Sequence, residues 1–458
     1  MGLAVVAFIV LTENLGSRMY PPGSAAWRRV LIPVIGSLVT GYLLYRFAPD
    51  ARGSGVPQTK AALLARAGRI TINTVIGKFL FTAGALASGI PLGREGPSVQ
   101  VGAGIASVIG RRLGLSRERV KALVPAGTSA ALAAAFNTPL AAVLFTLEEL
   151  MGDMHAPVLG SVVLSATTSW LVLRMVLGHE PLFHVPHYEL VHPVEFIFYA
   201  LLGLLGGLVS VVFVKLLLRM RAWFLRLPVR SQWFHPVAGG LAVGLVGLFV
   251  PEVLGVGYKF VSQALNGGML LRLMVILVVF KLLTVAIGYA SGNAGGIFGP
   301  SLYIGAMLGG PVGEVAHHIL PGFTGAPGAY ALVGMGAAFA GIIRAPMTSV
   351  IMIFEITRDY SIIVPLMIAN MISLFISARF QPLPIYEELS LQDGIHLPTS
   401  KTAGRSTSLL VERALRPTTE FFTTQMTVSQ ALERARRSTS HAWPVIEQGK
   451  LKTSVWID

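Results

Sequence analysis

An acidic residue stands between glycines at the start of a long apolar segment. Glu95 occurs in the pentapeptide GREGP at 93–97, and the flanking residues 72–92 and 98–110 are nearly uncharged, so Glu95 is expected at membrane depth. A carboxylate in the membrane interior costs a few kcal/mol, and such residues usually line a cavity or an ion path. The plainer alternative is that Glu95 pairs with Arg94 in a connecting loop.

A second copy of this frame occurs later in the chain. The sequence GIFGP at 296–300 repeats the Gly-x-x-Gly-Pro spacing. The residues that match between the two copies are Ser98 with Ser301, Gly102 with Gly305, Ala103 with Ala306, Gly110 with Gly313 and, farther along, Gly127 with Gly336. Proline suits the first turn of a helix, and the free N–H groups at a helix N-terminus attract anions. Two such helix starts predict a shared anion site.

The composition is that of a polytopic membrane protein. Hydrophobic residues make up 53% of the 458 residues and charged residues 13%, which lies outside the soluble globular range. The formal net charge is +14, but the basic residues are scattered through connecting segments, so membrane topology explains them better than nucleic acid binding. The chain has no cysteine, and its histidines lack a metal-ligand spacing, so neither a disulfide nor a metal site is expected.

Apolar spans recur along the chain. They cover residues 30–48, 158–176, 196–217, 236–250, 271–289, 330–343 and 362–376. The first apolar run, residues 3–11, has no basic region before it and no small-residue cleavage site after it, so it is not interpreted as a signal peptide. It is also too short to cross a bilayer. We therefore expect a truncated first helix.

Ser54 lies in another helix start that is rich in glycine and proline. The sequence GSGVP at 53–57 precedes an apolar helix and has an echo around Gly255 and Gly257, where Val256 replaces the serine. Only the first copy therefore keeps a hydroxyl that can donate to an anion. The alternative is that Ser54 is an ordinary helix N-cap.

Two adjacent acids follow the next apolar helix. The segment Pro139 to Glu148 has the same length as Pro346 to Glu355, so Glu148 has a counterpart. It is expected to satisfy backbone donors or a basic partner near a helix end. Glu149 has no counterpart, because its equivalent is Ile356. Glu149 is either solvated surface or a proton port.

The chain changes character after Tyr386. An aromatic residue just past the last span is usually an interfacial anchor, and from about residue 392 the composition becomes that of a soluble protein. We expect a membrane domain over 1–390, with halves 1–190 and 194–390, and a tail over 391–458. The tail should contain a helix at 428–437 and a strand at 442–446.

Together these motifs resemble the CLC family of chloride channels and chloride/proton antiporters. The segments GSGVP at 53–57, GREGP at 93–97 and GIFGP at 296–300, followed by Tyr386, occur in that family's order and approximate spacing. The resemblance implies an all-α membrane fold of tilted, broken helices in two inverted repeats, assembled as a homodimer. It also implies that the tail is a partial cytosolic α/β segment similar to the first half of a CBS domain.

The resemblance assigns roles to individual residues. Ser54 and Tyr386 would donate to a central chloride, together with the backbone amides of Ile297 and Phe298. Glu95 would be the gating glutamate, which competes with chloride when it is ionised. The supporting loop residues would be Gly53, Gly55, Gly93, Arg94, Gly96 and Gly296. The presence of Ser54 and Tyr386 favours chloride over nitrate or fluoride.

Glu149 matches the inner proton-transfer glutamate of the family's antiporters. This favours chloride/proton exchange, and the alternative is a voltage- or pH-gated chloride channel without proton coupling. An intramembrane enzyme using Glu95 and Glu149 would lack a nucleophile, a metal cluster and a phosphate loop, so neither enzymatic activity nor a cofactor is expected. Short connectors favour a prokaryotic plasma membrane, with the tail in the cytoplasm.

Overall fold

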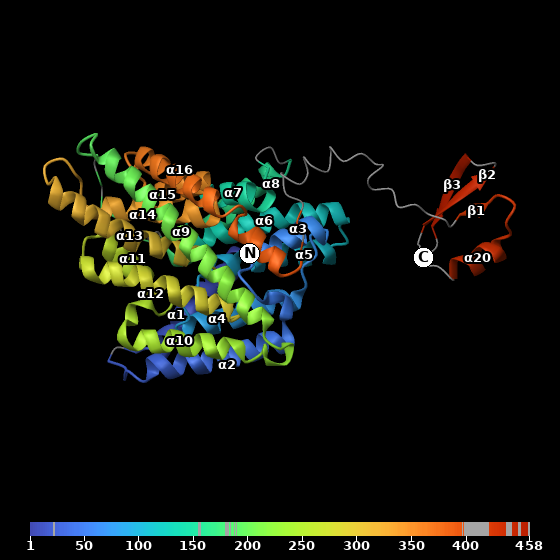
Figure 1. Ribbon diagram of the computed structural model, residues 1–458, viewed down its shortest axis with the longest axis horizontal. Coiled ribbons are helices and arrows are strands. Elements are labelled where there is room, and N and C mark those ends of the chain that lie inside the picture. Colours follow the sequence, from blue (N-terminus) through green and yellow to red (C-terminus); the bar gives the residue numbers. More distant parts are fainter. Residues whose placement is uncertain are drawn as a thin grey trace. The chain divides into compact units, whose positions relative to one another are not determined.

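Figure 1 shows the computed structural model of the chain, which forms two compact units, Met1–Leu397 and Pro398–Asp458. The residues described are 1–21, 23–153, 157–178, 183, 185–186, 188, 190–395, 397, 421–436, 442–447 and 450–456. In these residues the larger unit consists of helices and connecting loops, and the smaller one contains a sheet and a helix. The larger unit extends slightly past the boundary expected at residue 390.

The first half of the larger unit runs from α1 to α8. Its elements are α1 (Gly2–Met19), α2 (Arg28–Phe47), the 3₁₀ turn η1 (Pro49–Ala51), α3 (Val56–Ala65), α4 (Ile72–Ala87), α5 (Glu95–Arg112), α6 (Arg117–Phe136), α7 (Pro139–Phe145), the π-helical turn η2 (Thr146–Met151) and α8 (Leu159–Leu177). Helices α5 and α6 pack against each other, and α8 covers α6.

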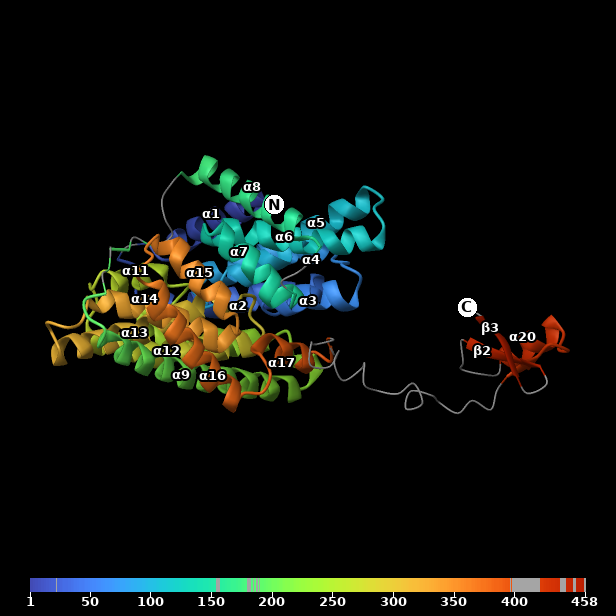
Figure 2. The same ribbon diagram turned by 90° about the horizontal axis from the view of Figure 1, so that it is seen from above.

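The second half repeats this order. Its elements are α9 (Glu195–Arg226), η3 (Val229–Ser231), α10 (His235–Phe249), η4 (Pro251–Val253), α11 (Tyr258–Leu265), α12 (Leu271–Ala290), α13 (Phe298–Ile319), α14 (Pro327–Ile343), α15 (Pro346–Thr357), α16 (Ile363–Phe380) and α17 (Ile385–Gln392). The series η1-α3-α4-α5-α6-α7 thus recurs as η4-α11-α12-α13-α14-α15. Figure 2 shows the two sets side by side, blue to cyan and yellow to orange.

The helices are broken at the same place in both halves. Asn137 and Arg344 have left-handed backbones, with φ of 60° and 67°, and they end α6 and α14. Such conformations are uncommon for residues other than glycine and stop a right-handed helix. Pro139 and Pro346 then begin α7 and α15, where a missing N–H costs nothing. The local sequence therefore determines where α6 and α14 end and where α7 and α15 begin.

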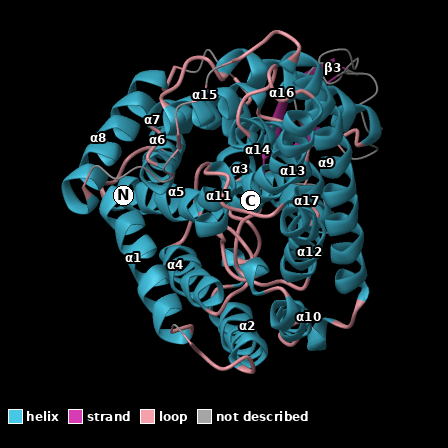
Figure 3. Cartoon of the chain, turned by 90° about the vertical axis from the view of Figure 1, so that its left-hand side faces the viewer, coloured by secondary structure: helices cyan, strands magenta, loops and turns pink. Residues whose placement is uncertain are grey.

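The two GxxGP loops meet at the centre of the larger unit. Gly93 and Gly296 exchange backbone hydrogen bonds in both directions, each with an N···O distance of 2.7 Å. Helices α5 and α13 follow these loops, so their N-terminal ends lie next to each other. Figure 3 shows α5, α11 and α13 in the interior, with α1, α2, α8, α9 and α10 around the outside. The contact is the one expected of two inverted repeats, which confirms the expected fold class.

Glu148 and Glu355 each bind the helix start of the opposite half. The Glu148 carboxylate accepts hydrogen bonds from the backbone N–H groups of Met347 (3.2 Å) and Thr348 (2.8 Å) in α15. The Glu355 carboxylate accepts from Leu140 (2.9 Å) and Ala141 (2.7 Å) in α7. These N–H groups have no acceptor within their own helices. The prediction of a symmetric role satisfying backbone donors is therefore confirmed for Glu148.

Glu148→Ala is expected to destabilise the protein without changing its transport properties. The substitution leaves two helix-start donors and the Thr348 hydroxyl without their acceptor, and losing such a cap costs about 1–2 kcal/mol. The thermal unfolding midpoint in detergent should fall, and Glu355→Ala should lower it by a similar amount because its contacts are equivalent. A Glu148→Ala midpoint equal to that of the unaltered protein would contradict this role.

The structure corrects the alignment of the repeats by two residues. A Cβ atom on Gly127 would collide with the carbonyl oxygen of Gly102, and one on Gly334 would collide with that of Gly305. Gly334, and not Gly336, is therefore the equivalent of Gly127. Because alanine, glycine and valine recur throughout both segments, the sequence match alone left the register ambiguous.

The first helix is longer than its apolar run. Helix α1 continues past the run at 3–11 to Met19, and it is one of six helices in the described part that are long and apolar enough to cross a membrane. The expectation that this segment is too short to span is therefore wrong. The helix continues through its polar residues, of which Glu13 forms an ion pair with Arg94 at 3.0 Å.

The smaller unit is a βαββ arrangement. Its elements are β1 (Phe422–Thr423), α20 (Val428–Arg436), β2 (Ala442–Glu447) and β3 (Lys450–Trp456), with sheet order β1-β2-β3. Strands β1 and β2 are parallel and β2 and β3 antiparallel. The buried Trp443 ring stacks on Phe422 at 4.8 Å. The expected helix and strand are confirmed, and the order of elements is consistent with the opening of a CBS domain.

Candidate anion and proton site

Glycines bring the start of α3 against the start of α5. Gly55 has a φ of 102°, a left-handed conformation that favours glycine. A Cβ on Gly55 would collide with the carbonyl oxygen of Gly96, and a Cβ on Gly96 would collide with Ser54. Ser54 therefore lies directly against the first turn of α5, because neither glycine carries a side chain.

Ser54 and Tyr386 place two buried hydroxyl groups in the same region. Both residues are fully buried, at 0% exposure. Tyr386 lies on α17, which packs against α3, the helix that begins just after Ser54. Within the described residues, neither hydroxyl oxygen has a hydrogen-bond partner. A buried hydroxyl is normally hydrogen-bonded, so this pair is suited to donate to an anion. The interfacial-anchor alternative for Tyr386 is excluded by its burial.

The N-terminus of α13 supplies backbone donors. Ile297 and Phe298 are buried, and the Phe298 ring packs on Phe136 at 4.6 Å and Phe339 at 4.5 Å. Gly299 donates its N–H to Glu95 at 3.1 Å. In the part of the chain that the structure describes, the N–H groups of Ile297 and Phe298 have no acceptor. The first N–H groups of a helix are those that bind anions.

Glu95 is fully buried and does not pair with Arg94. Its carboxylate accepts hydrogen bonds from the Tyr258 hydroxyl and from Gly299 N–H. Arg94 instead forms an ion pair with Glu13 at 3.0 Å. The loop alternative for Glu95 is therefore wrong. Its carboxyl group occupies the start of α13.

Glu149 is also buried and is paired with a residue that the sequence analysis missed. Its side chain lies 3.0 Å from the ammonium group of Lys60, and both side chains are nearly inaccessible, at 7% and 11% exposure. Glu149 belongs to the π-helical turn η2, a distortion often found at functional sites. The solvated-surface alternative is therefore wrong. The available signal was Lys60 itself, the one charged residue of α3.

Two further buried lysines hold the loops before α3 and α11. Lys78 of α4 donates to the carbonyl oxygen of Gly53, and Lys281 of α12 donates to that of Gly255 at 2.7 Å. Both side chains are fully buried. The two lysines are related by the same sequence offset as the two GxxGP loops, so the repeat could have revealed them. Lys78 thus fixes the loop that contains Ser54, and Lys281 fixes the loop before α11.

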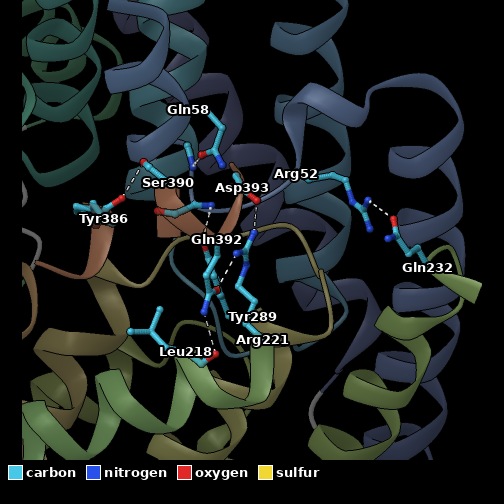
Figure 4. Close-up of polar contacts among 12 residues, drawn as sticks. Arg52, Gln58, Leu218, Arg221, Gln232, Tyr289, Tyr386, Ser390, Gln392 and Asp393 are labelled. Atoms are coloured by element: carbon cyan, nitrogen blue, oxygen red, sulfur yellow. Dashed lines mark hydrogen bonds and ion pairs between the residues drawn. The ribbon is translucent and has the colours of Figure 1, made fainter. Parts of the chain in front are cut away.

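An arginine clamp fixes the helix that carries Tyr386 (Figure 4). Arg221 of α9 forms an ion pair with Asp393 and donates to Gln392 at 2.8 Å, just past the other end of α17. Gln392 in turn donates to the carbonyl oxygen of Leu218 at 3.1 Å. Three contacts thus join the end of α17 to α9, and Tyr386 is held in position at its beginning.

A positively charged cavity of about 720 Å³ reaches the Ser54 loop. Gly53 and Gln58 lie in its wall. Its charged lining residues are Arg52, Arg66, Arg69, Arg221, Asp50 and Asp393. Arginines outnumber aspartates in this lining, and a cleft with one dominant sign of charge concentrates counter-ions. The cavity therefore favours anions near Ser54.

These features define a membrane anion transporter with two buried acids at its centre. Helix starts from inverted repeats converge on unpartnered donors, which is how transporters built from broken helices form their substrate sites. The chain belongs to the CLC family: it matches the family described as voltage gated chloride channel over residues 36–378. The expected family is thereby confirmed.

Known relatives include exchangers and a channel by name. An H⁺/Cl⁻ exchange transporter ClcA of Vibrio campbellii is 32% identical over 366 residues, which covers 79% of this chain and 78% of the relative. A ClcB-like chloride channel protein of Ralstonia nicotianae is 34% identical over 347 residues, which covers 75% and 81%. The crystal structure of a slow cyanobacterial Cl⁻/H⁺ antiporter is similar, with a TM-score of 0.78, 26% identity and coverage of 86% and 95%.

Proposed function

We propose that this protein exchanges chloride for protons across a membrane. The observation that carries the proposal is that two buried acids have separate partners: Glu95 accepts from Gly299 N–H at the start of α13, and Glu149 pairs with Lys60 of α3. A chloride path alone needs hydroxyl and amide donors but no second acid. A buried acid away from the anion donors suits a proton path. The exchange transporters among the relatives support the same conclusion.

In this proposal chloride binds between the start of α13 and two hydroxyl groups. Ser54 and Tyr386 donate their hydroxyl hydrogens, and Ile297 and Phe298 donate their backbone N–H groups. Glu95 governs access, because its ionised carboxylate holds Gly299 N–H at the same helix start. When Glu95 is protonated, its attraction to the helix N-terminus falls and chloride can replace it. One group thereby couples anion occupancy to protonation.

Glu149 takes the role of the inner proton acceptor. It is separate from the donors at α13, and its partner is the ammonium group of Lys60 at 3.0 Å. A proton that reaches Glu149 can then move toward Glu95 through the region of Tyr386. No enzymatic step is part of this proposal, since the two acids handle protons and no substrate bond is broken.

The deciding experiment uses proteoliposomes with a chloride gradient, a proton-sensitive dye and a clamped membrane voltage. We expect chloride moving down its gradient to drive protons uphill in the opposite direction. Chloride flux with no proton movement would contradict exchange and would identify a chloride channel, as the name of the ClcB-like relative suggests for that protein. The clamp is needed because a voltage created by chloride alone would also move protons.

Ser54→Pro is expected to shift the preference from chloride toward nitrate. The substitution removes the buried hydroxyl, and it also removes the Ser54 N–H, which donates to the Tyr289 hydroxyl at 3.2 Å. Ser54→Ala is the matched control, since it removes the hydroxyl and keeps the N–H. The ratio of nitrate to chloride flux should rise in the proline variant. Gly55 is the N-cap of α3, and the Ser54 hydroxyl caps no helix, so unchanged selectivity in both variants would mean that this hydroxyl does not bind the anion.

The assembly and orientation follow from the family resemblance. We propose a homodimer in a prokaryotic plasma membrane, with the segment after residue 391 on the cytoplasmic side. Cross-linking in native membranes tests the dimer. Protease treatment of intact and broken cells tests the orientation, because a cytoplasmic tail is cut only in broken cells.

A further inference from the structure

Tyr258 is an unexplained partner of the buried acid at the anion site. It is the first residue of α11, and its hydroxyl donates to one carboxylate oxygen of Glu95. The other oxygen accepts from Gly299 N–H. Within the described residues these two groups are the hydrogen-bond donors to Glu95, so the tyrosine supplies half of them. A hydrogen bond to a carboxylate stabilises its ionised form.

The ring of Tyr258 is held from two sides. The Arg94 guanidinium lies 5.3 Å from the ring centroid, and the Phe183 ring meets it edge-on at 5.4 Å. Arg94 is in turn fixed by its ion pair with Glu13 of α1, whose side chain is 66% exposed. A chain of contacts thus leads from an exposed acid through Arg94 and Tyr258 to Glu95. The orientation of the Tyr258 phenol is therefore set by packing. A residue that positions another group must itself be held in this way.

We infer that Tyr258 is a positioning residue that holds ionised Glu95 in the anion site and thereby sets the pH at which chloride transport begins. This inference rests on the proposed role of Glu95. With the phenol in place, the ionised carboxylate has two donors and chloride is kept out. Without it, one donor remains, so protonated Glu95 and an open site prevail at a higher pH.

Three of the other charged or titratable groups near Glu95 are bound to other partners. The charged and titratable groups that face this region are Arg94 beside α5, Glu13 of α1, Tyr386 of α17, Lys281 of α12 and Tyr303 of α13. Arg94 is committed to Glu13, and Lys281 donates to the carbonyl oxygens of the loop before α11. Tyr303 donates to the backbone of Glu252 at 3.2 Å. Among the residues that the structure describes, Tyr258 is the side chain that donates directly to Glu95.

The test is the pH dependence of chloride flux in proteoliposomes. In Tyr258→Phe the midpoint should move to higher pH by about one unit, the size expected for one hydrogen bond to a charged group. Tyr303→Phe is the matched control, because it removes a buried phenol bonded to a backbone carbonyl, and its midpoint should stay unchanged. Equal midpoints for Tyr258→Phe and the unaltered protein would overturn the inference.

Two further variants keep the test decisive. Replacing Tyr258 by 3-fluorotyrosine preserves the shape and strengthens the donor, so the midpoint should move to lower pH even if the phenylalanine variant does not fold. An unmoved or raised midpoint would overturn the inference.

Glu95→Gln separates the proposed role of Glu95 from the inferred role of Tyr258. If flux in that variant still depends on pH, the role of Glu95 fails. If it does not, unmoved midpoints in the Tyr258 variants overturn only the role of Tyr258.

Discussion

Glu95→Gln is expected to abolish proton movement while chloride movement continues. Glutamine has nearly the same shape as protonated glutamic acid but cannot ionise, so it cannot hold Gly299 N–H as an anion. The site then stays open to chloride at every pH, and no group at the anion site carries a proton across. In the voltage-clamped liposome assay, proton uptake driven by chloride should fall to the level of protein-free liposomes.

The Glu95→Gln experiment needs a control variant that loses the same charge elsewhere in the protein. Glu314 lies on α13 and is exposed, so Glu314→Gln removes the same charge away from the anion site and should leave both fluxes unchanged. Retained proton coupling in Glu95→Gln would show that another group links the two fluxes. Loss of chloride flux together with proton flux would point to a collapsed site instead, and chloride binding by calorimetry would reveal it.

The sequence predicted those features that depend on glycine and proline residues at the ends of helices. Glycine and proline mark helix starts by their own backbone properties, so the starts of α3, α5 and α13 could be located without a structure. Because the frames occur twice, the repeat also separated Glu148, which has a counterpart, from Glu149, which has none. The reciprocal contacts of Glu148 with Thr348 and of Glu355 with Ala141 show why that comparison worked.

Long-range partners could not be predicted in this way. Tyr258 lies 163 residues from Glu95 in the sequence, and Lys60 lies 89 residues from Glu149. No periodicity or spacing joins such pairs. Tyr258 meets Glu95 where the two halves pack together, and Lys60 meets Glu149 where α3 packs against η2 within the first half. The length of α1 was missed for a related reason. The polar residues Thr12 and Glu13 end the apolar run in the sequence, but the helix continues through them to Met19.

Glu149→Ala is expected to abolish proton movement and to leave chloride binding nearly unchanged. The carboxylate lies in η2, away from the donors at the start of α13, so its removal takes away a proton acceptor and no anion ligand. Chloride affinity from calorimetry should stay close to that of the unaltered protein, and chloride-driven proton uptake should disappear. Lost chloride binding would count against the separate roles of Glu149 and Glu95.

The ion pair with Lys60 must be controlled in this experiment. Removing Glu149 alone leaves a nearly buried ammonium group unpaired, and breaking a buried pair costs on the order of 3 kcal/mol. The double variant Lys60→Met, Glu149→Ala removes both charges, so it should recover stability and still lack proton movement. Glu148→Ala should show the opposite pattern, with lower stability and intact exchange, because its carboxylate only caps α15. If the double variant still moved protons against their gradient, Glu149 would not lie on the proton path.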